Sequence, residues 1–324
     1  MELQKRYLIR FSVIGNVLMP IINKMRLEKI IKNIINKLPY VRTLYKNSLN
    51  SNVPNGHYYS AVFSIEDIKK RQSEIWKNID KDGVNGIELN TLEQKKLVQE
   101  FIQYYSQLPF KSEKSIGIRY QFENGYYSYT DGIVLYSMIR YFQPKQIVEI
   151  GSGFSSAVML DTNEIFFDNQ INLTFIDPYA ERLFSLMTEE DKKRIKVIEK
   201  DVQVISLSVF ENLQAGDILF IDSTHVSKTG SDVNYILFEI LPILKSGVLI
   251  HFHDVFYPFE YPKDWVFRGI NWNEDYILRA FLMYNNKFKV VLFSEYLHKH
   301  HKDVFCDLPL CYKNEGGNLW LEKK

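Results

Sequence analysis

The sequence has little of three things that would settle a class of protein at once: cysteine, a surplus of charge of one sign, and a long apolar run. Only Cys306 and Cys311 are present, with no second pair that would complete a zinc site. They could form a local disulfide, but we expect two reduced thiols, as in a cytosolic protein. The 40 Lys and Arg residues are balanced by 39 Asp and Glu residues, so no overall field would attract nucleic acid. These absences favour a cytoplasmic protein without a nucleic-acid partner.

The apolar stretch at residues 7–22 is not expected to cross a membrane. Arg10, Gly15 and Pro20 interrupt it, and it is shorter than the roughly 20 apolar residues that a bilayer requires. No small-residue cleavage site follows it, so we do not expect a signal peptide either.

Residues 24–38 predict a basic amphipathic helix. Lys and Arg lie opposite an apolar face whose members recur at helical spacing: Leu27, Ile30, Ile31, Ile34, Ile35 and Leu38. Such a helix packs on its own protein or on a second copy in a homo-oligomer, or it contacts an anionic membrane surface through residues 1–40. In the last case the protein would be peripheral to the inner face of the membrane.

Proline and glycine residues mark breaks between elements, and they predict that the chain has three parts. Pro39 ends the amphipathic helix, and Gly56 lies in a linker that follows it. Thr91 and Gln94 have the spacing of a capping box, which predicts a helix that begins there. The predicted parts are a helical extension at residues 1–50, a cap of helices and aromatic loops at residues 51–130, and an α/β ligand-binding domain at residues 131–324.

The stretch from Gln146 to Leu160 indicates how the last part is organised. It reads as a buried strand of β-branched residues, a tight turn with Gly151 and Gly153, and the start of a helix. Ser155 and Ser156 are candidates for the helix N-cap. Backbone N–H groups at such a turn point to its mouth, where a ligand can approach.

Apolar strands alternate with helical segments from there to the end of the chain. The expected strands are residues 146–150, 173–176, 195–198, 217–221, 247–252, 288–293 and 318–321, and the longest helices are expected at residues 132–142, 232–245 and 274–284. This alternation predicts an α/β fold with a doubly wound, mostly parallel, seven-stranded sheet and right-handed crossovers.

Ligands of such sheets bind outside the carboxyl ends of the strands, so the residues at those ends are candidates for a site. Glu149 can accept a hydrogen bond from a cationic amine or hold the glycine turn. Asp177 follows the second strand at about the distance where an acid reaches ribose hydroxyls, and Asp201 follows the third, where it could receive an adenine amino group. The alternative is that both aspartates cap turns.

These motifs resemble those of class I S-adenosylmethionine-dependent methyltransferases. The resemblance rests on Val148–Gly153, Phe175–Pro178 and Asp201. It implies a Rossmann-like fold and S-adenosylmethionine as the cofactor. The residues that it implies for cofactor binding are Glu149, Gly151, Ser152, Gly153, Ser155, Asp177 and Asp201. A nicotinamide fold is the rival, but Ser156 stands where its third glycine would be expected.

A second resemblance covers about residues 55–322. It rests on His57–Tyr59, Gly125–Tyr129, Phe220–His225, Lys228–Val233 and His251–Pro258. These segments are similar to those of a bacterial methyltransferase family often found among surface-polysaccharide and secondary-metabolite genes. The acceptor is generally not assigned within that family, and our hypothesis is O-methylation of a saccharide or another small hydroxylated acceptor. We expect His57, Tyr58, Tyr59, Tyr127 and Tyr257 to contact it.

Asp222, His225, His253 and Asp254 are the candidates for the chemistry. They follow two strands that we expect to be neighbours, so they could converge on one divalent cation. Similarity to catechol-type O-methyltransferases implies Asp222, His253 and Asp254 as ligands and His225 as the base. A histidine ligand makes Mg²⁺ less suitable than Mn²⁺.

A mechanism without a metal is the alternative. His225 or His253 would then take the proton of the acceptor, and Asp222 or Asp254 would orient the ring. We expect His251, inside its strand, to be buried and hydrogen-bonded, and the cluster His298–His301 to form a solvated loop. Two other functions remain open: a metal-dependent oxygenase or hydrolase on the same fold, and a membrane-recruited scaffold without catalysis.

Overall fold

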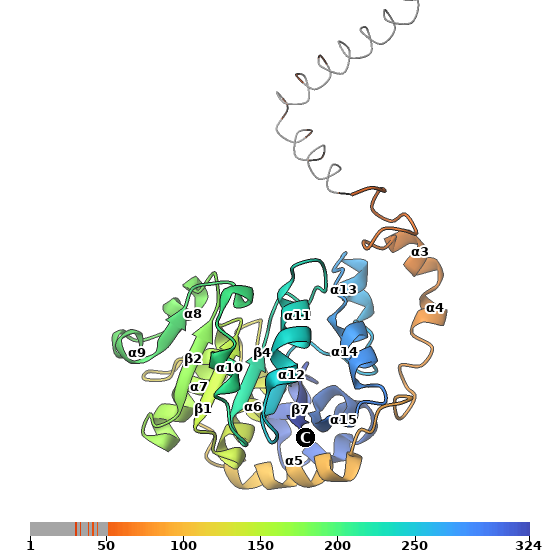
Figure 1. Cartoon of the computed structure of the whole chain (residues 1–324). Helices are drawn as coiled ribbons and strands as arrows, with labels where there is room; N and C mark the ends of the chain where they lie inside the picture. Colours follow the sequence, from red (N-terminus) through yellow and green to blue (C-terminus); the bar gives the residue numbers. More distant parts are fainter. Residues whose placement is uncertain (1–29, 31–32, 34–37, 39–40, 42–43, 45–50) are drawn as a thin grey trace, which may run out of the picture. The chain divides into compact units, whose positions relative to one another are not determined.

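The computed structural model describes residues 51–324 together with Ile30, Asn33, Leu38, Val41 and Leu44 (Figure 1). Apart from Ile30, Asn33 and Leu38, the amphipathic helix predicted at residues 24–38 lies outside the described residues. Within the described part, no helix is long and apolar enough to cross a membrane.

The chain divides into two compact units, residues 1–68 and 69–324. This division differs from the boundaries at residues 50 and 130 that the sequence predicts. Residues 69–130 belong to the unit that contains the sheet, because helix α5 packs on α6 and on strand β6. Leu97, Val98 and Phe101 of α5 are buried in the same core as the strands.

Seven strands form one mixed sheet in the order β3-β2-β1-β4-β5-β7-β6. The strands are β1 (Gln146–Ile150), β2 (Asn172–Ile176), β3 (Lys196–Ile198), β4 (Ile218–Ile221), β5 (Leu249–Phe252), β6 (Phe288–Phe293) and β7 (Leu319–Lys323). The first five are parallel, and β7 pairs antiparallel with both β5 and β6. The predicted seven-stranded, mostly parallel sheet is therefore confirmed.

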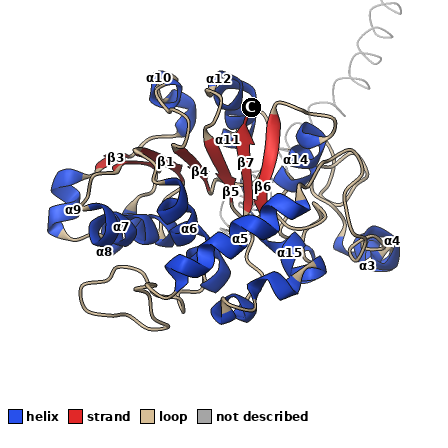
Figure 2. Cartoon of the chain, turned by 90° about the horizontal axis from the view of Figure 1, so that it is seen from below, coloured by secondary structure: helices blue, strands red, loops and turns tan. Residues whose placement is uncertain are grey.

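Helices cover both faces of the sheet, with α5, α6 and α7 on one face and α11, α12 and α14 on the other (Figure 2). The described α-helices are α3 (Ile65–Lys70), α4 (Gln72–Ile75), α5 (Thr91–Tyr105), α6 (Tyr129–Phe142), α7 (Phe154–Phe167), α8 (Glu181–Leu186), α9 (Glu189–Arg194), α10 (Ser208–Glu211), α11 (Asp232–Tyr235), α12 (Leu241–Ile243), α13 (Lys263–Phe267), α14 (Glu274–Leu282) and α15 (Ser294–His300). Short helical segments of other types are η1 (Val202–Val204), η2 (Ile236–Ile240), η3 (Lys302–Phe305) and η4 (Pro309–Lys313). Strands β4 and β5 are buried along their whole length. β4 is an unbroken apolar run, as a strand covered on both faces requires, and β5 has one polar residue, His251.

Three local predictions need correction. The predicted helix at residues 232–245 contains a π-helical segment, η2, between α11 and α12. Pro242 follows that segment and has no backbone N–H to donate, so a regular helical ladder cannot continue through it. Residues 298–300 lie in α15 instead of a solvated loop, and His298 is buried against Phe305.

The third correction concerns the start of α5. Asn90 is its N-cap, and no side chain caps it. Gln94 does not close a capping box, because its amide donates to the Leu89 carbonyl and accepts from the Phe293 backbone N–H at 2.8 Å. This side chain therefore joins the helix to strand β6.

Candidate active site

The carboxyl ends of β1, β2, β4 and β5 meet because the parallel ladder continues past the last strand residues. Asp222 follows β4 and donates its backbone N–H to Ile150 at 2.9 Å. His253 follows β5 and donates in the same way to Ile221 at 2.9 Å. The polar residues after these strands are thus held by main-chain hydrogen bonds, and their side chains start from fixed positions.

Gly151 lets the turn after β1 pass against the backbone of Asp222. Its φ is +80°, and a Cβ atom at this position would lie 1.7 Å from the Asp222 carbonyl oxygen. Because that oxygen belongs to the backbone, it cannot move aside as a flexible side chain would. The turn therefore requires glycine at this position.

Glu149 holds the glycine turn from below. Its carboxylate is fully buried and accepts hydrogen bonds from the hydroxyl groups of Ser155 and Ser156. Burial raises its pKa to about 8, although the two serine hydrogen bonds act in the opposite direction. Glu149 thus holds the glycine turn, which is one of the two roles that the sequence suggested for it. The N-cap of α7 is Gly153 and not a serine, and the Ser156 hydroxyl accepts from the Gly153 N–H at 3.0 Å.

A crevice of about 360 Å³ opens at the ends of β1, β2, β3 and β4. It is lined by Ile150, Gly151, Ile176–Tyr179, Asp201–Gln203, Asp222–Thr224, Lys228 and Gly230–Asp232. Asp177 lines it and also ties two loops together, because its carboxylate accepts from the N–H groups of Ser152 and Tyr179, each at 2.8 Å. The predicted residues Gly151, Asp177 and Asp201 thus line one crevice.

The lining of this crevice fits a nucleoside. The Ser223 hydroxyl is buried there and finds no hydrogen-bond partner within residues 51–324, as expected of a group that a ligand satisfies. Carboxylates can accept the hydroxyl groups of a ribose, and Asp177 and Asp201 lie on the lining. The glycine turn leaves room for a ligand beside the backbone.

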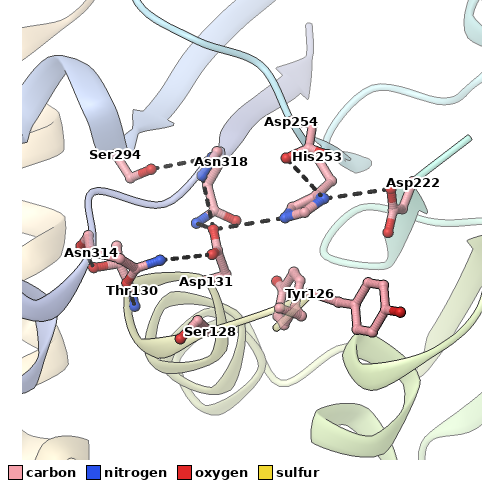
Figure 3. A network of polar contacts seen from close by, with 12 residues as sticks. Tyr126, Ser128, Thr130, Asp131, Asp222, His253, Asp254, Ser294, Asn314 and Asn318 are labelled. Atoms are coloured by element: carbon pink, nitrogen blue, oxygen red, sulfur yellow. Dashed lines mark hydrogen bonds and ion pairs between the residues drawn. The ribbon is translucent and has the colours of Figure 1, made fainter. Parts of the chain in front are cut away.

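Asp222, His225, His253 and Asp254 form one cluster, in part visible in Figure 3. The Asp222 Oδ1 lies 3.4 Å from His225 Nε2 and 3.4 Å from His253 Nδ1. The carboxylate of Asp254 lies 4.0 Å from His225 Nε2 and 3.7 Å from His253 Nδ1. Both imidazoles therefore point a ring nitrogen at the same two carboxylates.

The other ring nitrogen of each imidazole faces a further, buried carboxylate that the sequence did not predict. His225 Nδ1 lies 2.8 Å from Glu274 Oε2, at the first turn of α14. His253 Nε2 lies 3.8 Å from Asp131 Oδ1, in the first turn of α6 (Figure 3). Asp131 is itself fixed by the Gly317 N–H and the Asn318 side-chain amide, each at 2.9 Å. No local motif could have signalled these partners.

The charges of the cluster shift the ionisation of its members. Burial acts to lower the pKa of His225, but the contacts with Asp222 and Glu274 outweigh it and raise that pKa well above 6.5. Burial also acts to lower the pKa of His253, but the carboxylates of Asp254 and Asp222 outweigh it and raise that pKa to about 10. For Asp222, burial acts to raise the pKa, but the two imidazoles lower it well below its usual range. Both imidazoles thus stabilise the ionised form of Asp222.

His251 lies inside β5, two residues before His253. It is buried and hydrogen-bonded, as expected. It is fully buried, its Nε2 lies 2.8 Å from Asn318 Oδ1, and its ring stacks on Phe220 at 3.9 Å between centroids. Burial, with a smaller contribution from the charge of His253, lowers its pKa to about 3. A neutral, packed ring here is part of the floor of the site.

Comparison with known proteins decides the family. Residues 148–255 match the family described as "Methyltransferase domain". A protein of Archaeoglobus fulgidus, itself uncharacterized, is 33% identical over 167 residues, which are 50% of this chain and 73% of that protein. The chain is therefore a methyltransferase. We call the crevice at the glycine turn the cofactor crevice, because we expect the methyl donor of this methyltransferase to bind there.

Two solved structures are similar to the methyltransferase at low sequence identity. The S-adenosylhomocysteine-bound methyltransferase PaMTH1 of Podospora anserina is 17% identical, with 85% of this chain and 99% of that chain covered and a TM-score of 0.39. The O-methyltransferase TomG of Streptomyces achromogenes, in complex with S-adenosylmethionine, is 14% identical, with 74% and 92% covered and a TM-score of 0.39. At this degree of similarity neither structure bears on the acceptor or the metal.

A second cavity of the methyltransferase, about 520 Å³, opens on the other side of the cluster. Its lining residues are Gly125, Tyr126, Ser128, Asp131, His253, Asp254, Phe256, Pro262, Trp265, Glu295 and Asn314–Gly317. Asp222 lines the cofactor crevice, whereas His253 and Asp254 line this cavity. The polar cluster thus lies between the two.

The residues predicted to contact the acceptor lie in different places. Tyr257 is fully buried, and its hydroxyl donates to the Lys81 carbonyl, so it fills the core and corrects the expectation that it lines the acceptor site. Tyr127 is buried beside His253, at 5.0 Å between ring centroids. Tyr58 and Tyr59 are exposed in the first unit, and the His57 ring stacks on Tyr58 at 4.3 Å. Their contact with an acceptor stays a prediction.

Proposed function

We propose that this methyltransferase methylates a hydroxyl group of a small hydroxylated acceptor, such as a glycosyl unit of a polysaccharide precursor or sugar nucleotide. One observation carries the proposal: Asp222 lines the cofactor crevice and contacts both imidazoles, while His253 and Asp254 line the second cavity. Groups that can take a proton from an alcohol therefore lie between a site for the methyl donor and a site for an acceptor.

The residues of the cluster would hold and deprotonate the acceptor. S-adenosylmethionine, when bound, supplies an electrophilic methyl group, so the chain has to supply positioning and a proton acceptor. His225 is the proposed base, because its Nε2 points to Asp222 and Asp254 while Nδ1 is held by Glu274. Glu274 thus fixes the ring orientation and leaves Nε2 toward the reacting side.

A divalent cation at the same cluster would assist by polarising the acceptor hydroxyl. Asp222, His225 and Asp254 each offer one ligand atom, and these atoms lie within 4.8 Å of one another. The His253 Nδ1 is buried and lies close to the same carboxylates without a hydrogen bond of good geometry among the described residues. This mixed set of imidazole and carboxylate donors suits Mn²⁺ better than Mg²⁺.

This geometry changes the ligand set that the resemblance implies. There Asp222, His253 and Asp254 are the ligands and His225 is the base, whereas the compact group contains His225. If His225 binds the cation, His253 is the residue left to face the second cavity, and the two imidazoles exchange roles. A metal-free mechanism with His225 as the base is the simpler alternative.

Isothermal titration of the full chain with S-adenosylmethionine and S-adenosylhomocysteine tests the proposal first. We expect saturable binding of both, and the absence of binding at millimolar ligand would contradict it. Asp201→Asn should weaken S-adenosylhomocysteine binding about tenfold, because a carboxylate on the lining is lost. Asp264→Asn, which changes an exposed carboxylate outside the lining, is the matched control and should leave binding unchanged.

Titration of the chelator-treated chain with Mn²⁺ separates the two mechanisms. Saturable Mn²⁺ binding that Asp254→Asn weakens would support metal assistance. Turnover that is unchanged by chelation, with no Mn²⁺ binding, would leave the metal-free mechanism. S-adenosylhomocysteine formation over a panel of hydroxylated acceptors measures turnover in both cases.

A further inference from the structure

The second cavity has an aromatic wall. Phe256 and Trp265 pack edge to face at 5.0 Å between centroids, and both line the cavity. Tyr126 also lines it, with 63% of its surface exposed. Its ring is fixed even so, because it stacks on Phe154 and the Arg182 guanidinium lies 4.0 Å from its centroid. The cavity thus offers rigid aromatic faces to a ligand.

The polar lining of this cavity is acidic. Asp131, Asp254, Glu295 and Glu315 line it, and none of the described lining residues is Lys or Arg. The Lys299 ammonium pairs with Glu295 at 2.6 Å, and Asp131 is engaged by Gly317 and Asn318. Asp254 faces His253 Nδ1 at 3.7 Å. Glu315 has no side-chain partner of this kind among residues 51–324, so its oxygens can receive donors from a ligand.

The rim of the cavity is preformed by a glycine loop. Gly316 has a φ of +69°, and a Cβ atom there would lie 2.7 Å from Asp131 Oδ1. Gly317 donates to the same carboxylate, and its carbonyl accepts from the Val255 N–H at 3.3 Å. The loop is therefore held directly against the residues that support His253, and Figure 3 shows Asn314 and Asn318 joined to Asp131 in this network.

From this lining we infer that the cavity binds the acceptor as a glycosyl ring that carries no carboxylate or phosphate group. A sugar ring offers apolar C–H faces to aromatic side chains and hydroxyl donors to carboxylates, and both are present. An anionic substituent would instead meet four carboxylates, and none of the described lining residues is Lys or Arg. The basic side chain among them, His253, already faces Asp131, Asp222 and Asp254. The inference rests on the proposed function and narrows its acceptor class.

Saturation-transfer NMR of the full chain, loaded with S-adenosylhomocysteine, tests this with matched probes. The probes are the methyl glycosides of glucose, galactose and mannose, each paired with its uronide, in which a carboxylate replaces the C6 hydroxymethyl group. We expect at least one neutral glycoside to bind and its uronide to bind at least about tenfold more weakly, since like charges face each other. Equal or tighter binding of the uronides, or no binding of any neutral glycoside, would overturn the inference.

Two variants show whether the signal comes from this cavity. Trp265→Ala should weaken the neutral glycoside about tenfold, whereas Phe238→Ala, which removes an exposed ring outside the lining, should not. Glu315→Gln should reduce the difference between each glycoside and its uronide, because a repelling charge is lost. An unchanged difference in Glu315→Gln, or unchanged binding in Trp265→Ala, would count against this cavity.

Titration with S-adenosylhomocysteine in parallel separates two failures. If the nucleoside does not bind, the proposed function fails. If it binds and no neutral glycoside does, only the acceptor class is refuted.

Discussion

The two sides of the site are built in different ways. The cofactor side depends on contacts between residues close in sequence: the Glu149 carboxylate is six and seven residues from Ser155 and Ser156. The proposed acceptor side depends on pairs far apart, such as His225 with Glu274, 49 residues away, and Asp131 with Asn318, 187 residues away. The cofactor side is a backbone turn in which Gly151 leaves no room for a Cβ atom. The proposed acceptor side is a set of charged side chains held by distant partners.

This difference predicts that variants on the two sides change different measurements. A change in the glycine turn should reduce stability and cofactor binding together, because the turn is also part of the β1 to α7 connection. A change in the imidazole and carboxylate cluster should reduce turnover and leave cofactor binding nearly as it was. The proposed difference between the two sides is wrong if both kinds of variant change stability, cofactor binding and turnover in the same way.

His225→Ala should have the largest effect on turnover. Loss of the proposed base is expected to lower kcat by roughly two to four orders of magnitude. Its ring does not line the cofactor crevice, so the affinity for S-adenosylhomocysteine should change by less than about threefold. Turnover is measured as S-adenosylhomocysteine release and affinity by calorimetry. Unchanged turnover would remove His225 from the mechanism.

Gly151→Ala should have the largest effect on stability. The new Cβ would meet the Asp222 carbonyl at 1.7 Å, and the φ of +80° adds strain for any residue with a Cβ. We expect a loss of roughly 3 kcal/mol in the free energy of unfolding and a loss of cofactor binding. Thermal denaturation followed by circular dichroism measures the first effect.

Gly117→Ala is the matched control for that variant. Its φ is +79°, but a Cβ there would have no atom within 4 Å. It should therefore cost only the backbone strain, roughly 1 kcal/mol. If both variants lose the same stability, close approach to Asp222 is not the reason for glycine in the turn.

The same difference explains what the sequence could predict. β-Branched runs, a glycine turn and an acid after each strand are local patterns, so they predict the seven strands and the lining residues Gly151, Asp177 and Asp201. Asp131 and Glu274 stand in no such pattern, because their role exists only once α6 and α14 dock beside the sheet.

Local patterns also misled where tertiary contacts offered a better partner. Gln94 has the spacing of a capping box, yet it satisfies the Phe293 N–H, which would otherwise be buried without a partner. Tyr257 lies in an aromatic motif that suggested an acceptor wall, but a large ring that finds core contacts on Phe293 and Tyr296 is more stable when buried.

Glu274→Gln and Asp131→Asn test whether the buried carboxylates support a metal site. A carboxylate behind a ligating imidazole fixes the ring, and its loss typically weakens metal binding 10- to 100-fold. We expect about this loss of Mn²⁺ affinity in Glu274→Gln, whose oxygen lies 2.8 Å from the ring. Asp131→Asn should lose less, because its oxygen lies at 3.8 Å. Calorimetric titration with Mn²⁺ measures both.

The exposed Asp264→Asn is again the control, and circular dichroism checks that each variant folds. Equal Mn²⁺ affinity in the wild type and both variants would show that these carboxylates do not position metal ligands. A larger loss in Asp131→Asn than in Glu274→Gln would reverse the ranking that the distances give.

The effect of Glu149→Gln on stability should depend on pH. The pKa of Glu149 is raised from 4.5 to about 8 by burial, so the folded chain favours the protonated carboxyl group. A raised pKa contributes stability that is complete below pH 4.5 and is lost as the pH rises to about 8. Within that window the free energy of unfolding of the wild type should fall by about 1 kcal/mol per pH unit relative to Glu149→Gln.

Urea denaturation of both proteins at pH 6, 7 and 8 measures this slope. Glutamine keeps an acceptor for the Ser155 and Ser156 hydroxyl groups but cannot ionise, so it removes the titration and retains the support of the turn. If the two proteins show the same pH dependence, Glu149 is ionised in the folded state. The glycine turn would then contain a buried negative charge. Both sides of the site would depend on buried charges, and the difference between them would no longer hold.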